Sequence, residues 1–190
     1  MKTKVLIFAA LSTSLNAFGA EKEDSALNDV YIKYGGWSKH IKEDNDDYNY
    51  NETHNGIGIE WTFASSDNLR HNLALGYFQM TDSFGFNNKQ GGLIYSYRPD
   101  TGYSFLDRFS PNLSLMIMDR GWIHRSRSNY NDYYFSQQTT VTFLPYLTYN
   151  ITDYLNIDLI YIPKLNYSSP KATYFVRAGF RLNKLKEWLN

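Results

Sequence analysis

The most constraining feature of this 190-residue chain is a regular alternation of two kinds of side chain, which is clearest from Asn72 to Gly85. The large apolar residues of one set stand at every second position, at Leu73, Leu75 and Tyr77. A two-residue period is that of a β-strand whose two faces have different surroundings. The other face begins polar or small, turns apolar at Phe78 and Met80, and ends at the adjacent pair Asp82-Ser83. This pattern predicts a strand with one apolar face and one face that carries polar groups at its end.

Seven further segments repeat the alternation. The eight predicted strands are Val30–Lys39, Gly56–Phe63, Asn72–Met80, Gly91–Arg98, Asn112–Met118, Thr139–Asn150, Leu155–Pro163 and Thr173–Leu182. No apolar run beyond the N-terminal leader is long enough for a membrane helix. Mean hydropathy is −0.50 although aromatic residues make up 17% of the chain. Outer-membrane barrels combine these properties because only every second strand residue meets lipid. We therefore predict an all-β fold, an eight-stranded antiparallel up-and-down transmembrane β-barrel.

The N-terminus has the pattern of a secretory signal peptide. Lys2 and Lys4 precede an apolar run, and small residues follow up to Gly19, so we expect residues 1–19 to be removed. Removal of the two lysines from 19 basic residues leaves 17 against 19 acidic residues, a balance that does not favour nucleic acid. The chain has no cysteine and is expected to be exported without disulfides. The remainder divides into a periplasmic segment at 20–29, a barrel at 30–182 and a tail at 183–190.

One face of each later strand is predicted to meet lipid. These residues are Ile57, Ile59, Trp61, Leu73, Leu75, Tyr77, Leu93, Tyr95, Tyr97, Leu113, Leu115, Ile117, Val141, Phe143, Leu147, Tyr149, Leu155, Ile157, Leu159, Tyr161, Tyr174, Val176, Ala178 and Phe180. Many rows end in an aromatic residue, as the interfacial girdles of a barrel do. We expect the mature chain to lie in the outer membrane of a Gram-negative cell.

Strand parity predicts which connections share an end of the barrel. With a periplasmic N-terminus, odd-numbered connections lie outside the cell, and they include the longest ones. They are Ser38–Asn55, Thr81–Gln90, Asp119–Gln138 and Lys164–Lys171. His40 and the pair Asp82-Ser83 are therefore predicted to share one rim.

The inward face is predicted to be divided into two halves. The outer half carries the apolar residues Phe78, Met80, Met116, Met118, Ile160 and Ile162. In the inner half, Glu60 and Asp158 are available to neutralise some of Arg98, Arg177 and Arg181. A barrel of eight strands has room for one slender ligand, and an apolar outer half suits a hydrocarbon chain. The alternative is that these side chains simply fill the lumen.

Two prolines predict an interruption of the wall between neighbouring strands. Pro145 falls inside one predicted strand and Pro163 ends the next. Proline donates no ladder hydrogen bond and marks an edge or bulge within a sheet. We interpret the pair as a lateral opening through which a lipid tail enters the lumen. The alternative is a local irregularity without function.

The order and spacing of several sequence blocks resemble those of the outer-membrane lipid A palmitoyltransferases (PagP). The blocks are Tyr50-Asn51-Glu52 followed by Gly56-Ile57-Gly58, then Phe78 to Ser83, Tyr97-Arg98-Pro99, Phe143-Leu144-Pro145 and Tyr161-Ile162-Pro163. The resemblance implies transfer of a palmitoyl-like acyl chain from a phospholipid to the lipid A of lipopolysaccharide. It implies that His40, Asp82 and Ser83 carry the chemistry, that Pro145 and Pro163 give lateral access, and that Gly92 forms the floor of the acyl pocket. We expect a monomer that acts without a cofactor or metal ion.

Acyl transfer requires a base for the incoming hydroxyl and donors for the oxyanion. His40 is a suitable base because histidine titrates near neutral pH. Asp82 is a candidate to orient the imidazole, and Ser83 is a candidate for either nucleophile or oxyanion donor. His54, on the same rim, is the next candidate for the base.

Two other classes of protein fit parts of the pattern. A barrel without catalysis, used at the cell surface or in adhesion, would carry aromatic outer loops such as Tyr130 to Phe135 and would not need His40 or Ser83. A soluble periplasmic lipid-binding calyx would be extracted without detergent.

Overall fold

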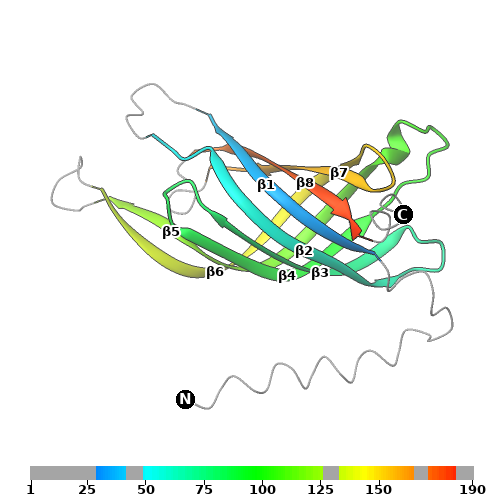
Figure 1. Cartoon of the computed structure of the whole chain (residues 1–190), viewed down its shortest axis with the longest axis horizontal. Helices are drawn as coiled ribbons and strands as arrows, with labels where there is room; N and C mark the ends of the chain where they lie inside the picture. The colour runs from blue at the N-terminus through cyan, green and yellow to red at the C-terminus, as the bar shows by residue number, and fades with distance from the viewer. Residues whose placement is uncertain (1–28, 42–48, 126–132, 165–170, 183–190) are drawn as a thin grey trace, which may run out of the picture.

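The computed structural model describes residues 29–41, 49–125, 133–164 and 171–182. The predicted signal peptide, nearly all of the periplasmic segment and the tail after Leu182 lie outside these residues. The strands are β1 (Val30–His40), β2 (Thr53–Ser65), β3 (His71–Thr81), β4 (Asn87–Tyr97), β5 (Phe109–Arg125), β6 (Tyr133–Asn150), β7 (Leu155–Ile162) and β8 (Thr173–Arg181) (Figure 1). A short 3-10 helix, η2 (Leu106–Arg108), precedes β5.

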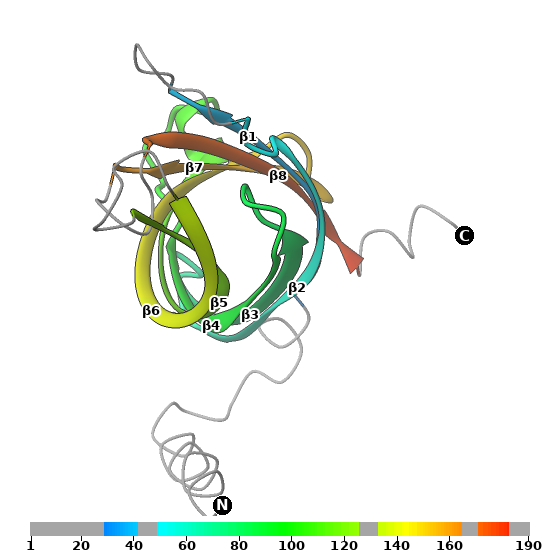
Figure 2. The same ribbon diagram turned by 90° about the vertical axis from the view of Figure 1, so that its left-hand side faces the viewer.

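Every strand pairs antiparallel with its sequence neighbours, and β1 also pairs with β8. The sheet is thus a closed barrel, which Figure 2 shows as a ring of strands. All eight predicted strands and their order are confirmed. We call the end that holds the β1–β2, β3–β4, β5–β6 and β7–β8 connections the site end, and the other the closed end.

Two of the predicted outer connections are shorter than expected. The β5–β6 ladder continues from Asp119 paired with Thr139 as far as Arg125 paired with Tyr133. Most of the predicted loop Asp119–Gln138 is therefore hairpin, which extends past the other strands in Figure 1. This region is rich in aromatic residues, which favour strands. The β3–β4 connection is also short, because β4 begins at Asn87.

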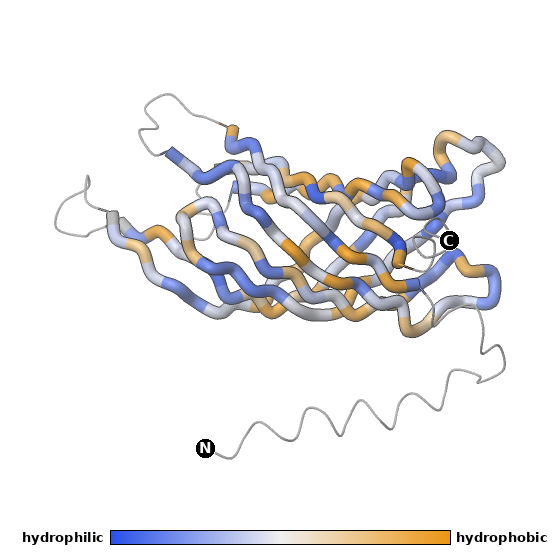
Figure 3. The backbone as a smooth tube through the Cα atoms, in the orientation of Figure 1, coloured by the Kyte–Doolittle hydropathy of each residue, from blue (hydrophilic) through white to orange (hydrophobic). Residues whose placement is uncertain are grey.

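The outer face of the barrel is apolar, as predicted. The exposed large apolar residues of the strands include Ile57, Ile59, Trp61, Leu75, Tyr77, Leu93, Tyr95, Leu113, Leu115, Ile117, Val141, Phe143, Leu159, Tyr161 and Tyr174. Hydrophobic and hydrophilic residues alternate along the strands in Figure 3. We call this surface the apolar belt. None of the described residues form a helix that is long and apolar enough to cross a membrane.

The lumen is divided as predicted, with apolar side chains toward the site end. A core cluster joins residues of six strands: Ala74, Phe78, Ile94, Met116, Met118, Tyr146, Ile160 and Phe175, with Met80, Leu144 and Ile162 packed against it. These side chains occupy the space in which a ligand chain would lie.

Toward the closed end the lumen contains a buried ionic network. Arg177 donates to Glu60 and, over 2.8 Å, to Asp158. Lys33 lies 2.9 Å from Asp158 and 3.2 Å from Glu60. Two cations and two carboxylates thus balance. The prediction that Glu60 and Asp158 neutralise Arg177 is confirmed. The ion pairs of Lys33 with the same two carboxylates were not predicted.

The other two arginines that we predicted to pair with Glu60 or Asp158 contact a different carboxylate. Arg98 and Arg181 both contact Asp29, which lies immediately before β1. The backbone N–H of Thr62 donates to the Asp29 carbonyl oxygen over 2.9 Å. Asp29 therefore ties the start of the barrel to β2, β4 and β8 at the closed end.

Candidate functional site

A β-bulge in β1 turns two polar side chains into the lumen at the site end. The register of β1 against both neighbouring strands shifts next to Gly35 and Gly36, whose φ angles are 92° and 112°. Such angles are strained for residues with a Cβ but accessible to glycine. Before the bulge Lys33 is buried, and after it Ser38 and His40 are. Without the bulge, strict alternation would turn Ser38 and His40 outward, because they have the parity of exposed Tyr34.

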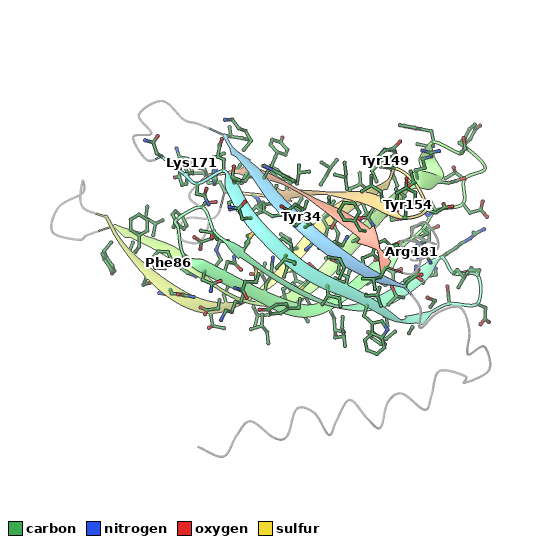
Figure 4. The ribbon with its side chains drawn as sticks, viewed as in Figure 1. Tyr34, Phe86, Tyr149, Tyr154, Lys171 and Arg181 are labelled. Atoms are coloured by element: carbon green, nitrogen blue, oxygen red, sulfur yellow. The ribbon has the colours of Figure 1, made fainter. Side chains whose placement is uncertain are left out.

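These side chains line a cavity of about 50 Å³ at the site end, which we call the rim cavity. Its lining residues are Ser38, His40, Tyr50, His54, Met80, Asp82, Ser83, Phe84, Asn88, Met118, Arg120, Ile162, Lys171, Thr173 and Phe175. Figure 4 labels Lys171 and Phe86 at this end, opposite Tyr149, Tyr154 and Arg181. The three predicted catalytic residues are thus brought to one cavity. Its volume suits water molecules and is too small for a fatty acyl chain.

The Glu52 carboxylate lies beside the His40 imidazole. Their Nδ1 and Oε1 atoms are 3.8 Å apart, and the backbone N–H of His40 donates to the same oxygen over 3.3 Å. The ring stacks on Tyr50 with 4.2 Å between centroids. Partial burial raises the pKa of Glu52, but hydrogen bonds from Lys39 and from the His40 backbone outweigh it and lower that pKa below its usual range.

Backbone N–H groups bind the carboxylate of Asp82, the residue that we predicted to orient the His40 imidazole. One oxygen accepts from Phe84 and Phe86, each over 2.9 Å, and the other accepts from Gly121 over 2.6 Å. These bonds tie the β3–β4 turn to β5. Asp82 therefore helps to build the wall of the rim cavity, and the Glu52 carboxylate also lies beside His40.

Ser83 follows in the same turn and lines the rim cavity. Its carbonyl oxygen accepts the Asn51 backbone N–H over 3.0 Å, and the Asn51 side chain donates to the Asp82 carbonyl oxygen over 3.2 Å. The turn is thereby joined to the segment that precedes β2.

His54 forms a second histidine arrangement in the same cavity. Its Nε2 lies 2.8 Å from the Ser38 hydroxyl and its Nδ1 lies 2.7 Å from the Thr81 carbonyl oxygen. The His54 side chain is almost completely buried, with 1% of its surface exposed.

Arg120 brings a positive charge to the rim cavity from β5. It lies close enough to Asp82 for their opposite charges to interact, and its Nε is buried without a hydrogen-bond partner among the described residues. The Asn88 Oδ1 is likewise buried without a hydrogen-bond partner among the described residues. Buried polar groups normally have partners, so these two are available to a ligand.

The predicted acyl pocket is filled in this structure. Phe78, Met80, Met116, Met118, Ile160 and Ile162 face inward as predicted but pack in or against the core cluster. Gly92 pairs with Met116 of β5. A Cβ at position 92 would lie 2.0 Å from the Leu115 carbonyl oxygen. Gly92 thus permits close approach of β4 and β5, and the structure has no open space beside it of the kind that a pocket floor requires.

The seam between β6 and β7 lacks strand pairing toward the site end. These strands form only five pairs, from Tyr146 with Ile160 to Asn150 with Asn156. The ladder ends directly beside Pro145, while on its other side Pro145 still pairs with Leu113. Pro163 follows the end of β7. The predicted interruption of the wall at the two prolines is confirmed at the level of strand pairing.

Within the described residues, no three His, Cys, Asp or Glu side chains gather in a way that could hold a metal ion.

The sequence did not point to Ser38 or Glu52 as site residues, and it indicated His54 only as the second candidate for the base. The adjacent glycines at 35 and 36 were the available signal for Ser38, since paired glycines in a strand mark a bulge. Glu52 and Arg120 offered no comparable signal, because their approach to the cavity depends on how distant segments pack.

No family model and no curated protein matches this chain. Solved structures similar to it include the Yersinia pestis attachment invasion locus protein Ail, with 15% identity, a TM-score of 0.42 and coverage of 81% of this chain and 97% of that one. Neisserial surface protein A has 17% identity, a TM-score of 0.41 and coverage of 80% and 95%. A chain described as de novo design of transmembrane β-barrels has 11% identity, a TM-score of 0.42 and coverage of 83% and 98%.

Proposed function

We propose that this protein is an outer-membrane acyltransferase that moves a fatty acyl chain from a phospholipid to lipid A. The observation that carries the proposal is the rim cavity, where two histidines and two serines meet above an apolar lumen. The unpaired part of the β6–β7 seam lies at the same end of the barrel.

The apolar belt supports the membrane location. Outward side chains such as Ile57, Val141 and Phe143 are about two-thirds exposed, at 60%, 64% and 67%. A continuous apolar surface around a closed barrel is unfavourable in water and favourable in lipid. It argues against the soluble calyx.

The rim cavity contains groups suited to moving an ester-linked chain. His40, with Glu52 beside it, is the histidine that we assign to the incoming hydroxyl group. Arg120 supplies positive charge for a developing oxyanion or for a lipid phosphate. Ser83 remains a candidate for nucleophile or oxyanion donor.

The β6–β7 seam is the route that we propose for the acyl chain. Entry requires the side chains that now fill the outer half of the lumen to move, and Met80 and Met118 are flexible residues that repack readily. The chain would then enter from the side, so its charged head group would stay at the membrane surface.

Mass spectrometry of lipid A and phospholipids from cells that express the protein tests this function. We expect lipid A that gains one acyl chain and a matching lysophospholipid, and far less of both products with His40→Ala. Unchanged lipids with a correctly folded wild-type barrel would contradict the acyltransferase.

A surface barrel without catalysis is the second candidate, and the projecting β5–β6 hairpin favours it. Phe135 of this hairpin packs against Phe84 and Phe86, with centroids 5.6 Å and 6.5 Å apart. Deletion of the hairpin tip would remove such a surface function while leaving the rim cavity in place.

Fractionation tests the location shared by both candidates. We expect the protein in the outer membrane, with migration on gels that changes on boiling, because a closed barrel resists detergent until heated. Recovery from the aqueous periplasmic fraction would contradict the membrane barrel.

A further inference from the structure

The contact between Ser38 and His54 has the geometry of a nucleophile and its base. The Thr81 carbonyl oxygen can only accept a hydrogen bond, so the His54 Nδ1, 2.7 Å away, carries the proton. In the neutral imidazole the Nε2 atom then has a lone pair. That lone pair faces the Ser38 Oγ at 2.8 Å and accepts its proton. A serine, a histidine and a group that fixes the tautomer are the three parts of an activated nucleophile.

The surrounding structure holds this pair in place. The bulge at Gly35 and Gly36 directs Ser38 inward, and a Cβ at Gly36 would lie 3.1 Å from the His54 Cβ, so a larger residue would displace the ring. On its other side the imidazole packs against Phe175, with 5.5 Å between centroids. The two glycines adopt these backbone angles without strain, and the bulge that they form brings the Ser38 hydroxyl to the His54 imidazole.

We propose that Ser38 is the nucleophile of the acyl transfer and carries the acyl group as an ester, with His54 as its general base. The proposal rests on the proposed function and assigns to Ser38 the step that the sequence had left open for Ser83. Ser38 and His54 both line the rim cavity, and Arg120 lies in the same lining with its free Nε. Its positive charge is available to the oxyanion.

The reaction balances in two steps. First, the Ser38 Oγ attacks the ester carbonyl carbon of the phospholipid and gives its proton to the His54 Nε2. The bond to the glycerol oxygen breaks, and that oxygen leaves with the proton as a lysophospholipid. Second, the acceptor hydroxyl gives its proton to the Nε2 and attacks the acyl-serine, and the Ser38 Oγ leaves with that proton. His40 then holds the acceptor hydroxyl during the second step.

An alkyl fluorophosphonate, which reacts with activated serine hydroxyls, tests the nucleophile on the mature barrel folded in detergent micelles. We expect mass spectrometry to find the phosphonyl group on Ser38, no label in Ser38→Ala, and labelling about 10²–10⁴-fold slower in His54→Gln. Ser114→Ala, which removes a buried serine away from the cavity, should label as the wild type does. Label on Ser83, or a folded wild type that takes no label, would overturn the proposal.

A cysteine variant keeps the test valid if Ser38→Ala does not fold. The chain has no cysteine, so Ser38→Cys introduces its only thiol. Iodoacetamide should alkylate Ser38→Cys at neutral pH faster than Ser38→Cys with His54→Gln, because the imidazole promotes the thiolate. Equal rates would overturn the role of His54.

Incubation with phosphatidylethanolamine micelles separates this proposal from the proposed function. Without acceptor, we expect an acyl ester on Ser38 and a matching amount of lysophospholipid, and His40→Ala should still form the ester. An ester on Ser38 that lipid A does not discharge would overturn the proposed acceptor and support the nucleophile. Equal acylation of lipid A by wild type and Ser38→Ala would overturn the nucleophile and leave the function standing.

Discussion

The two ends of the lumen differ in how their polar groups are satisfied. Toward the closed end, Lys33, Glu60, Asp158 and Arg177 bind one another. At the site end, Arg120 retains a buried atom without a partner, next to a cavity. The network at the closed end thus matches its charges internally, although Arg181 beside Asp29 also has a buried Nε without a hydrogen-bond partner among the described residues. At the site end both Arg120 and Asn88 have such an atom, and both line the rim cavity. We therefore expect changes in the network to affect mainly stability, and changes at the rim cavity to affect mainly activity.

The largest expected effect comes from breaking the matched network. Asp158→Ala leaves Lys33 and Arg177 with one carboxylate in place of two, and should cost about 3–5 kcal/mol of unfolding free energy. Urea unfolding of the barrel in detergent measures it. Asp100→Ala, which removes an exposed ion pair with Arg70, is the control and should cost less than about 1 kcal/mol. Equal losses of unfolding free energy in the two variants would show that the buried network stabilises the fold no more than an exposed ion pair does.

Substitutions at the site end should lower the rate of acyl transfer and should have little effect on the free energy of unfolding. His40→Ala removes the side chain beside Glu52 and should slow acyl transfer about 100-fold, because the acceptor hydroxyl loses its alignment. The assay is the rate of lipid A acylation from phospholipid in mixed micelles. His71→Ala, an exposed histidine at the closed end, should retain the wild-type rate. A similar loss in both variants would indicate a general effect on the barrel.

Adjacent glycines in β4 give a finer comparison of packing. Gly92→Ala places a Cβ 2.0 Å from the Leu115 carbonyl oxygen and should destabilise the barrel by about 1–3 kcal/mol. Gly91→Ala meets its nearest atom at 3.5 Å and should be neutral or stabilise slightly. Unfolding in urea compares the two. Equal stability would mean that the approach of β4 to β5 relaxes easily.

The smallest effect concerns Glu52. Because its pKa is lowered in the folded state, its charged form stabilises the fold above its usual pKa of 4.5, and this contribution is lost as the pH falls through the lowered value. Glu52 is partly exposed, so Glu52→Gln should cost less than about 1 kcal/mol at pH 7. Unfolding curves of the two proteins should converge in acid. A difference that persists at low pH would assign the effect to packing.

The sequence was a good guide to the barrel, since alternation reports which face meets lipid. It also predicted the break at Pro145, because a missing N–H has a local consequence. The sequence did not predict the parts of the site that depend on a bulge or on contacts between segments distant in the chain. The bulge at Gly35 and Gly36 reversed the alternation along β1 and so turned Ser38 inward. Glu52 contacts His40 from 12 residues further along the chain.

The pair of glycines in β1 also has a consequence for how such a barrel changes over generations. Loss of one of the two glycines would restore strict alternation in β1 and leave Tyr34 exposed on the outer face. It would reverse the inward and outward directions of the residues that follow in this strand. Ser38 and His40 would then face the lipid in one mutational step, without any change in their identity. A barrel of this kind can gain or lose its chemistry by an insertion or deletion, and comparison of residue identities alone would overlook the event.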